Sequence, residues 1–110
     1  MPGKEAMSPE NEEILADVPA NLFRGIEGVG GRLRITNQRL VFQPHAFNFQ
    51  KMPLEISLGD IAEATKRNSL GFIPNGILIR TRAGVEYKFV VWGRDKLLDI
   101  LQTRTVRPRS

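Results

Sequence analysis

The clearest structural pattern in the chain lies in the stretch Gly30-Gly31-Arg32-Leu33-Arg34-Ile35-Thr36-Asn37-Gln38-Arg39-Leu40-Val41-Phe42. Leu33 and Ile35 lie two residues apart, as do Arg32 and Arg34, so a β-strand buries the first pair and exposes the second. The polar Asn-Gln pair that follows predicts a turn into a second, apolar strand. We therefore expect a β-hairpin that presents basic side chains to solvent.

Three motifs recur around this hairpin. They are Gly-x-Leu-x-Ile-Thr-Asn-x-Arg-Leu-Val-Phe at residues 31–42, Leu-Glu-Ile-Ser-Leu-Gly-Asp-Ile at residues 54–61, and Gly84-x-x-Tyr87-x-Phe89. Together they resemble the GRAM family of PH-like domains, over residues 21–102. The resemblance implies a binding module that attaches peripherally to membranes through anionic lipid headgroups, or that docks onto a protein.

The composition predicts one globular domain. The chain has 110 residues, of which 41% are hydrophobic and 25% charged, and this is enough for one core but not for two. It contains no apolar run of about 18 residues, so we expect no transmembrane helix. It also contains no cysteine, which excludes disulfides and thiolate metal sites. The first residues lack the pattern of a signal peptide, so we expect a cytoplasmic protein, peripheral to a membrane if it binds lipid.

The net charge of +4 is unevenly distributed. Residues 1–27 contain two Lys or Arg against six Asp or Glu, so the remainder of the chain is distinctly basic. A basic surface attracts phosphates on lipids, on nucleic acid or on an acidic protein, and salt weakens this attraction. The split also suggests the hypothesis that an acidic leader folds across the basic body and masks it.

The periodicity predicts a mainly β (α+β) fold. We expect a PH-like barrel of about seven antiparallel strands in two nearly orthogonal sheets, closed by one C-terminal helix. The expected segments are an acidic, disordered leader at 1–13, the GRAM/PH-like domain at 14–103 and a basic, flexible tail at 104–110. The first strand is expected at 20–26, later strands at 39–43, 54–58, 61–67, 77–81 and 85–91, a loop at 68–76, and a helix after Gly93 with one apolar face formed by Leu97, Leu98 and Leu101.

The side chains that catalysis needs are scarce. His45 is the only histidine, and the acidic residues outside the leader lie singly. A lone histidine without partners is typical of a structural hydrogen-bonding residue rather than of a general base or a metal ligand. We therefore predict a non-catalytic protein with no catalytic residue, no metal and no cofactor.

A group of basic residues is the candidate anion-binding site. Arg32 and Arg34 share one face of a strand, and Arg39 begins the partner strand. The full set of candidates is Arg32, Arg34, Arg39, His45, Lys51, Lys66 and Arg67. The alternative is that each is a solvated surface charge, paired at little net gain with Glu55, Glu63 or Glu86.

The aromatic residues near the loops have two interpretations. Phe47 and Phe49 lie two apart in the 44–53 loop, beside Lys51, and could contact a membrane interface or a partner's groove. The alternative is a loop folded back onto the core. Trp92 is interpreted as a packing anchor between the last strand and the helix.

Two functions therefore stay open. The favoured one is peripheral membrane association through anionic lipid headgroups. The alternative is a module for protein–protein interaction or for self-association into a homo-oligomer, which uses a strand edge or the 44–53 loop. Nucleic acid is the least favoured partner, because it depends on the isoelectric point alone.

Overall fold

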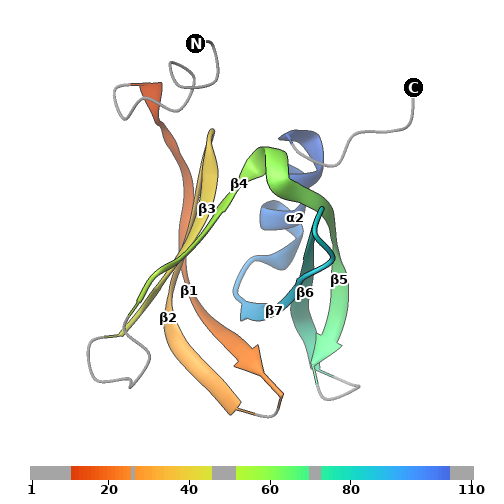
Figure 1. Cartoon of the computed structure of the whole chain (residues 1–110). Helices are drawn as coiled ribbons and strands as arrows, with labels where there is room; N and C mark the ends of the chain where they lie inside the picture. The colour runs from red at the N-terminus through yellow and green to blue at the C-terminus, as the bar shows by residue number, and fades with distance from the viewer. Residues whose placement is uncertain (1–10, 26, 46–51, 70–72, 105–110) are drawn as a thin grey trace.

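The computed structural model describes residues 11–25, 27–45, 52–69 and 73–104. In these residues the chain forms seven antiparallel strands followed by a helix (Figure 1). The elements are β1 (Ile14–Arg24), β2 (Glu27–Thr36), β3 (Arg39–Pro44), β4 (Leu54–Ser57), a 3-10 turn (Leu58–Asp60), β5 (Ile61–Ser69), β6 (Ile73–Thr81), β7 (Glu86–Val91) and α2 (Arg94–Arg104).

The strands form one curled sheet in the order β4-β3-β2-β1-β7-β6-β5. β1 joins its two halves, because it pairs with β2 along its length and its residues Ala20–Phe23 also pair with Lys88–Val91 of β7. Figure 1 shows β1–β4 on one side, β5 and β6 on the other, and α2 between them. The predicted PH-like fold is confirmed, with the two expected sheets hydrogen-bonded to each other through β1.

The predicted hairpin is confirmed in detail. Leu33 pairs with Phe42 across β2 and β3, and both side chains are buried. Ile35 is buried as well, whereas Arg32 and Arg34 are exposed on the opposite face. The alternation of side chains along a strand was therefore sufficient to assign the two faces of β2.

Two strand boundaries differ from the prediction. β1 begins at Ile14 rather than at residue 20, and this first turn of chain has no apolar alternation because Ile14 itself is exposed. β6 begins at Ile73, inside the segment predicted to be a loop. Pro74 is tolerated there because pairing with β7 starts only at Gly76, which leaves one edge of β6 without a strand neighbour at the proline.

The core fills the space between the two halves and the helix. Phe42 from β3 and Phe89 from β7 lie with their ring centroids 5.7 Å apart, so the two halves of the sheet meet through aromatic packing. The predicted apolar face of α2 is confirmed, since Leu97, Leu98 and Leu101 are all buried. The helix closes the concave side of the sheet, and the polar face of the sheet remains in solvent.

Residues 11–13 lie against the turn between β2 and β3. The Glu13 backbone N–H donates to Asn37 Oδ1 at 3.0 Å, and the Asn37 backbone N–H donates to the Glu13 carbonyl at 3.0 Å. Asn37 Nδ2 also donates to the Asn11 carbonyl at 3.0 Å. The rest of the predicted leader, residues 1–10, lies outside the described residues, as do 105–110 of the predicted tail. No helix in the described part of the chain is long and apolar enough to cross a membrane.

Candidate functional site

The predicted basic residues of the hairpin take part in an ion-pair network on the outer face of β1–β4. We call it the outer-face network and define it as Glu12, Asp17, Arg32, Arg34, Arg39 and Glu55. Asp17 from β1 binds two arginines, at 2.8 Å from its Oδ1 to Arg32 Nε and at 3.2 Å from its Oδ2 to Arg34 Nη2. Arg39 Nε lies 2.7 Å from Glu12 Oε2, and Arg39 Nη1 lies 2.8 Å from Glu55 Oε2. Three arginines therefore face three carboxylates, and the network has no net charge.

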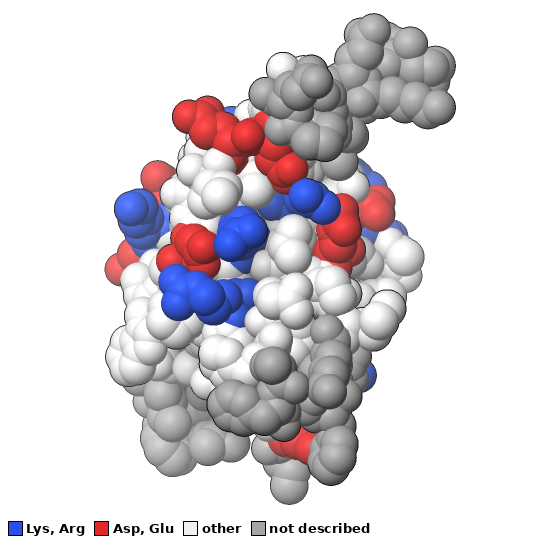
Figure 2. Space-filling model, turned by 90° about the vertical axis from the view of Figure 1, so that its left-hand side faces the viewer, with Lys and Arg blue, Asp and Glu red and all other residues white. Residues whose placement is uncertain are grey.

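Figure 2 looks onto this side of the molecule and shows Lys and Arg side chains interspersed with those of Asp and Glu. The hydrogen bond from Arg32 is the main cause that lowers the pKa of Asp17, and the bonds from Arg39 and then from the Thr36 hydroxyl lower the pKa of Glu12. The same contacts raise the pKa of Arg39. All members are thus ionised at neutral pH and held by one another.

The other predicted anion-binding residues are dispersed. Lys66 in β5 lies 3.3 Å from Asp95 in α2, far along the sheet from the outer-face network. Arg67 follows it and is exposed. Lys51, Phe47 and Phe49 lie outside the described residues.

His45 lies on the outer face, over Gly30. A Cβ added at Gly30 would lie 3.3 Å from the His45 ring and 3.3 Å from Asn21 Oδ1, so the missing side chain is what admits the imidazole. His45, Asn21 and Gly30 line a hollow of about 170 Å³ together with Pro19 and Trp92. The hollow contains hydrogen-bonding groups but no lysine or arginine.

The prediction for Trp92 is wrong. Its side chain is 69% exposed, and it is no anchor between β7 and α2. Phe89 and Val91 are buried, so the alternation of side chains along β7 directs the residue after Val91 to the outer face. The same alternation rule, applied beyond the strand end, could have found this exposed tryptophan.

A second cleft contains cations that the sequence analysis did not select. It lies where β1 and β7 diverge, because their pairing stops at Phe23 and Lys88 while Tyr87 continues to pair with Ile79 of β6. We call it the β1–β7 cleft. It has a volume of about 460 Å³ and is lined by Leu22, Phe23, Arg24, Gly25, Glu86, Tyr87 and Lys88.

The β1–β7 cleft differs from the outer-face network in its charge. Arg24 and Lys88 are exposed, and neither forms an ion pair with any residue that the structure describes. Glu86 is the one carboxylate among the lining residues. The two cations come from strands far apart in the sequence, so their proximity follows from the β1–β7 pairing and had no local signal.

The wider charge distribution agrees with this difference. Residues 11–57 contain five Lys or Arg and five Asp or Glu, so this half of the sheet is neutral. Residues 58–104 contain eight Lys or Arg against five Asp or Glu. The positive excess of the domain therefore belongs to β5–β7 and α2 rather than to the hairpin with the arginine pattern. No group of three His, Cys, Asp or Glu that could hold a metal ion occurs among the described residues.

Comparison with known proteins identifies the family. The model of the GRAM domain family matches residues 3–94. The chain belongs to the GRAM family. GRAM and PH-like domains are in general non-catalytic binding modules. A Dictyostelium discoideum protein, UDP-sugar-dependent glycosyltransferase 52, is 32% identical over 94 residues, a match that covers 84% of this chain and 5% of that protein. The GRAM domain described here thus spans a small part of this relative.

Solved structures share the fold of this GRAM domain at low sequence identity. The C-terminal domain of an unknown protein from Leishmania infantum superposes with a TM-score of 0.75, at 20% identity and with 94% of each chain covered. The Slm1 PH domain in complex with phosphoserine gives a TM-score of 0.66, at 14% identity and with 84% of this chain and 95% of that one covered. The same domain has been solved with D-myo-inositol-4-phosphate, with a TM-score of 0.62, 13% identity and coverage of 83% and 96%.

Proposed function

We propose that this GRAM domain binds phosphorylated, anionic lipid headgroups and attaches reversibly to membrane surfaces, with the β1–β7 cleft as the headgroup site. The observation that carries the proposal is the position of Arg24 and Lys88, two cations that line one cleft and form no ion pair within the described residues. Membership of the GRAM family supports it, as does the likeness to a PH domain solved with phosphoserine and with an inositol phosphate.

The cleft offers the groups that a phosphorylated headgroup requires. The Arg24 guanidinium and the Lys88 ammonium donate charge-assisted hydrogen bonds to a phosphate. The Glu86 carboxylate accepts from headgroup hydroxyls, and the Tyr87 hydroxyl both donates and accepts. Pockets for small ligands have volumes of about 300–1,000 Å³, and the 460 Å³ of this cleft lies in that range. The domain acts by binding, without a cofactor and without catalysis.

The outer-face network is the less favoured location. To bind a phosphate there, Arg32 and Arg34 would have to leave Asp17, and Arg39 would have to leave two carboxylates. An exposed ion pair contributes about 0–1 kcal/mol, so exchange is feasible, but each phosphate contact is offset by a lost one. His45, Lys51, Lys66 and Arg67 remain candidates for a surrounding positive surface, and Phe47 and Phe49 for insertion into the membrane interface.

Vesicle co-sedimentation tests the function. We expect the protein to pellet with phosphatidylcholine vesicles that contain a phosphatidylinositol phosphate, and not with phosphatidylcholine alone. Salt should weaken the binding, and a soluble inositol phosphate should compete if the headgroup itself occupies the site. No pelleting with anionic vesicles at low salt would refute the proposed function.

Two double variants that remove the same charge test the site. Each Lys or Arg near an anionic surface contributes about 1 kcal/mol, so Arg24→Ala with Lys88→Ala should lower the vesicle affinity about 30-fold. Arg32→Ala with Arg34→Ala should change it by less than about threefold, because Asp17 already holds both arginines. Equal losses would indicate diffuse attraction to net charge, and a loss confined to the second variant would move the site to the outer-face network.

A further inference from the structure

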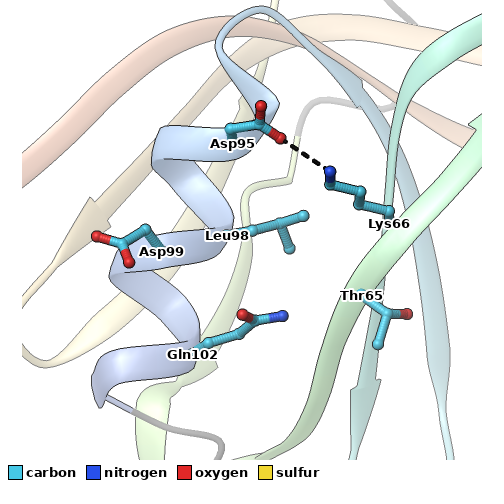
Figure 3. A pocket seen from close by; sticks show the side chains of 6 residues that line it. All are labelled: Thr65, Lys66, Asp95, Leu98, Asp99 and Gln102. Carbon is cyan, nitrogen blue, oxygen red and sulfur yellow. Dashed lines mark ion pairs between the residues drawn. The ribbon is translucent and has the colours of Figure 1, made fainter.

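A groove runs between the last strand of the sheet and the helix, away from the β1–β7 cleft. Figure 3 shows its lining: Thr65 and Lys66 from β5, and Asp95, Leu98, Asp99 and Gln102 from α2. We call it the β5–α2 groove, and its volume is about 370 Å³. The Leu98 side chain extends from the helix toward β5 and is buried, so the groove has an apolar floor between polar walls.

One wall of the groove is an open sheet edge. β5 is last in the strand order, so within the described sheet its strand neighbour, β6, lies on one side only. An edge strand presents backbone N–H and C=O groups that can pair with a further strand. The Lys66↔Ile77 and Arg67↔Gly76 pairs show that β5 stays extended along the groove.

A side chain already occupies the place of a strand neighbour. Gln102 Nε2 donates a hydrogen bond of 2.8 Å to the Ala64 carbonyl. The Ala64 carbonyl therefore points away from β6, and in a strand the N–H and C=O of Lys66, two residues later, point the same way. A side-chain amide N–H is the same kind of donor as a peptide N–H, so an incoming backbone can replace Gln102 at this carbonyl.

The charge of the groove selects among peptides. Its ionisable lining groups are Lys66, Asp95 and Asp99. Lys66 and Asp95 form an exposed pair at 3.3 Å, with side chains 61% and 83% exposed, and such pairs open at little cost. Asp99 has no ion-pair partner among the residues that the structure describes. The net charge of the lining is negative, which favours a basic side chain in the occupant.

We propose that the β5–α2 groove binds an extended peptide of a partner protein, which adds to the edge of β5 as a further strand and places a Lys or Arg beside Asp99. The regular part of β5 from Glu63 to Arg67 spans about 16 Å, and the lining residues of α2 from Asp95 to Gln102 span about 10 Å. These lengths fit a contact of about four extended residues. Backbone pairing supplies affinity, and Asp99 and Leu98 supply the preference for a basic residue and an apolar one.

Selection from a displayed library of random peptides tests this proposal on the full chain. We expect enriched peptides of about seven residues that contain Lys or Arg. With the bound peptide, hydrogen exchange at the Lys66 amide should slow, and Gln102→Ala should bind about fivefold tighter because the Ala64 carbonyl is released. No enrichment, or slowed exchange elsewhere, would overturn the proposal.

Two variants separate backbone pairing from charge. Lys66→Pro removes the edge donor and should abolish binding, although it makes the groove more acidic; circular dichroism confirms that the variant folds. Asp99→Lys should reverse the preference from basic to acidic peptides, whereas Asp60→Lys, on the 3-10 turn, should not. Tighter binding after deletion of residues 105–110, or a dimer by light scattering that Asp99→Lys dissociates, would assign the groove to the chain's own tail or to a second copy and contradict a partner peptide.

Discussion

The substitution Gly31→Ala tests the close approach of β2 and β3 beneath the outer-face network. A Cβ at Gly31 would lie 2.2 Å from the Gln43 carbonyl oxygen and 2.9 Å from both the Gln43 carbonyl carbon and Phe42 Cζ. Ordinary contact begins at 3.4 Å, so the shortest contact is more than 1 Å too close. The obstructing oxygen belongs to the backbone and cannot rotate away. Overpacking costs about 1–3 kcal/mol, and this contact should reach at least the upper end, about 3 kcal/mol.

Thermal unfolding followed by circular dichroism measures this cost. A loss of about 3 kcal/mol in a domain of this size should lower the Tm by about 10–20 °C. Gly59→Ala is the matched control, because no atom lies within 4 Å of its added Cβ, and its unfolding free energy should change by less than about 0.5 kcal/mol. Equal Tm values for the two variants would show that β2 and β3 do not approach as closely as described.

Two further predictions concern the core and the ion pairs. Leu33→Ala and Phe42→Ala should each lower the unfolding free energy by about 2–5 kcal/mol, because both side chains are buried; an unchanged urea midpoint in both would mean that the faces of β2 and β3 are reversed. Arg39 and Thr36 lower the pKa of Glu12, so the ionised carboxylate stabilises the fold above its ordinary pKa of about 4.3, and this contribution is lost as the pH falls through the lowered value. Urea midpoints should therefore fall more steeply in acid for the unaltered protein than for Glu12→Gln, and parallel curves would contradict the contact.

Much of the fold could be predicted from local patterns. The alternation in residues 30–42 gave both faces of the central hairpin, and the spacing of Leu97, Leu98 and Leu101 gave the buried face of α2. Gly84 was predicted to allow a tight hairpin, and it adopts φ +90° between β6 and β7. In each case the signal lies within a few residues, where strand or helix geometry alone determines which side chains share a face.

The charge environment could not be predicted in this way. Asp17 neutralises Arg32 and Arg34 because the register of β1 on β2 places Asp17 opposite Arg34, and nothing in either segment specifies that register. Arg24 and Lys88 line one cleft because β1 pairs with β7. Ion pairs and clefts between distant segments depend on strand order, which local periodicity does not contain.

A titration with D-myo-inositol-4-phosphate, followed by backbone amide chemical shifts, tests whether the β1–β7 cleft holds the headgroup. We expect the largest shifts at Gly25, Tyr87 and Lys88, at the end of β1 and the start of β7, and we expect them to disappear when Arg24 and Lys88 are both replaced by Ala. Shifts confined to residues around Arg32 and Arg34, or unchanged shifts in the double variant, would contradict the assignment of the site.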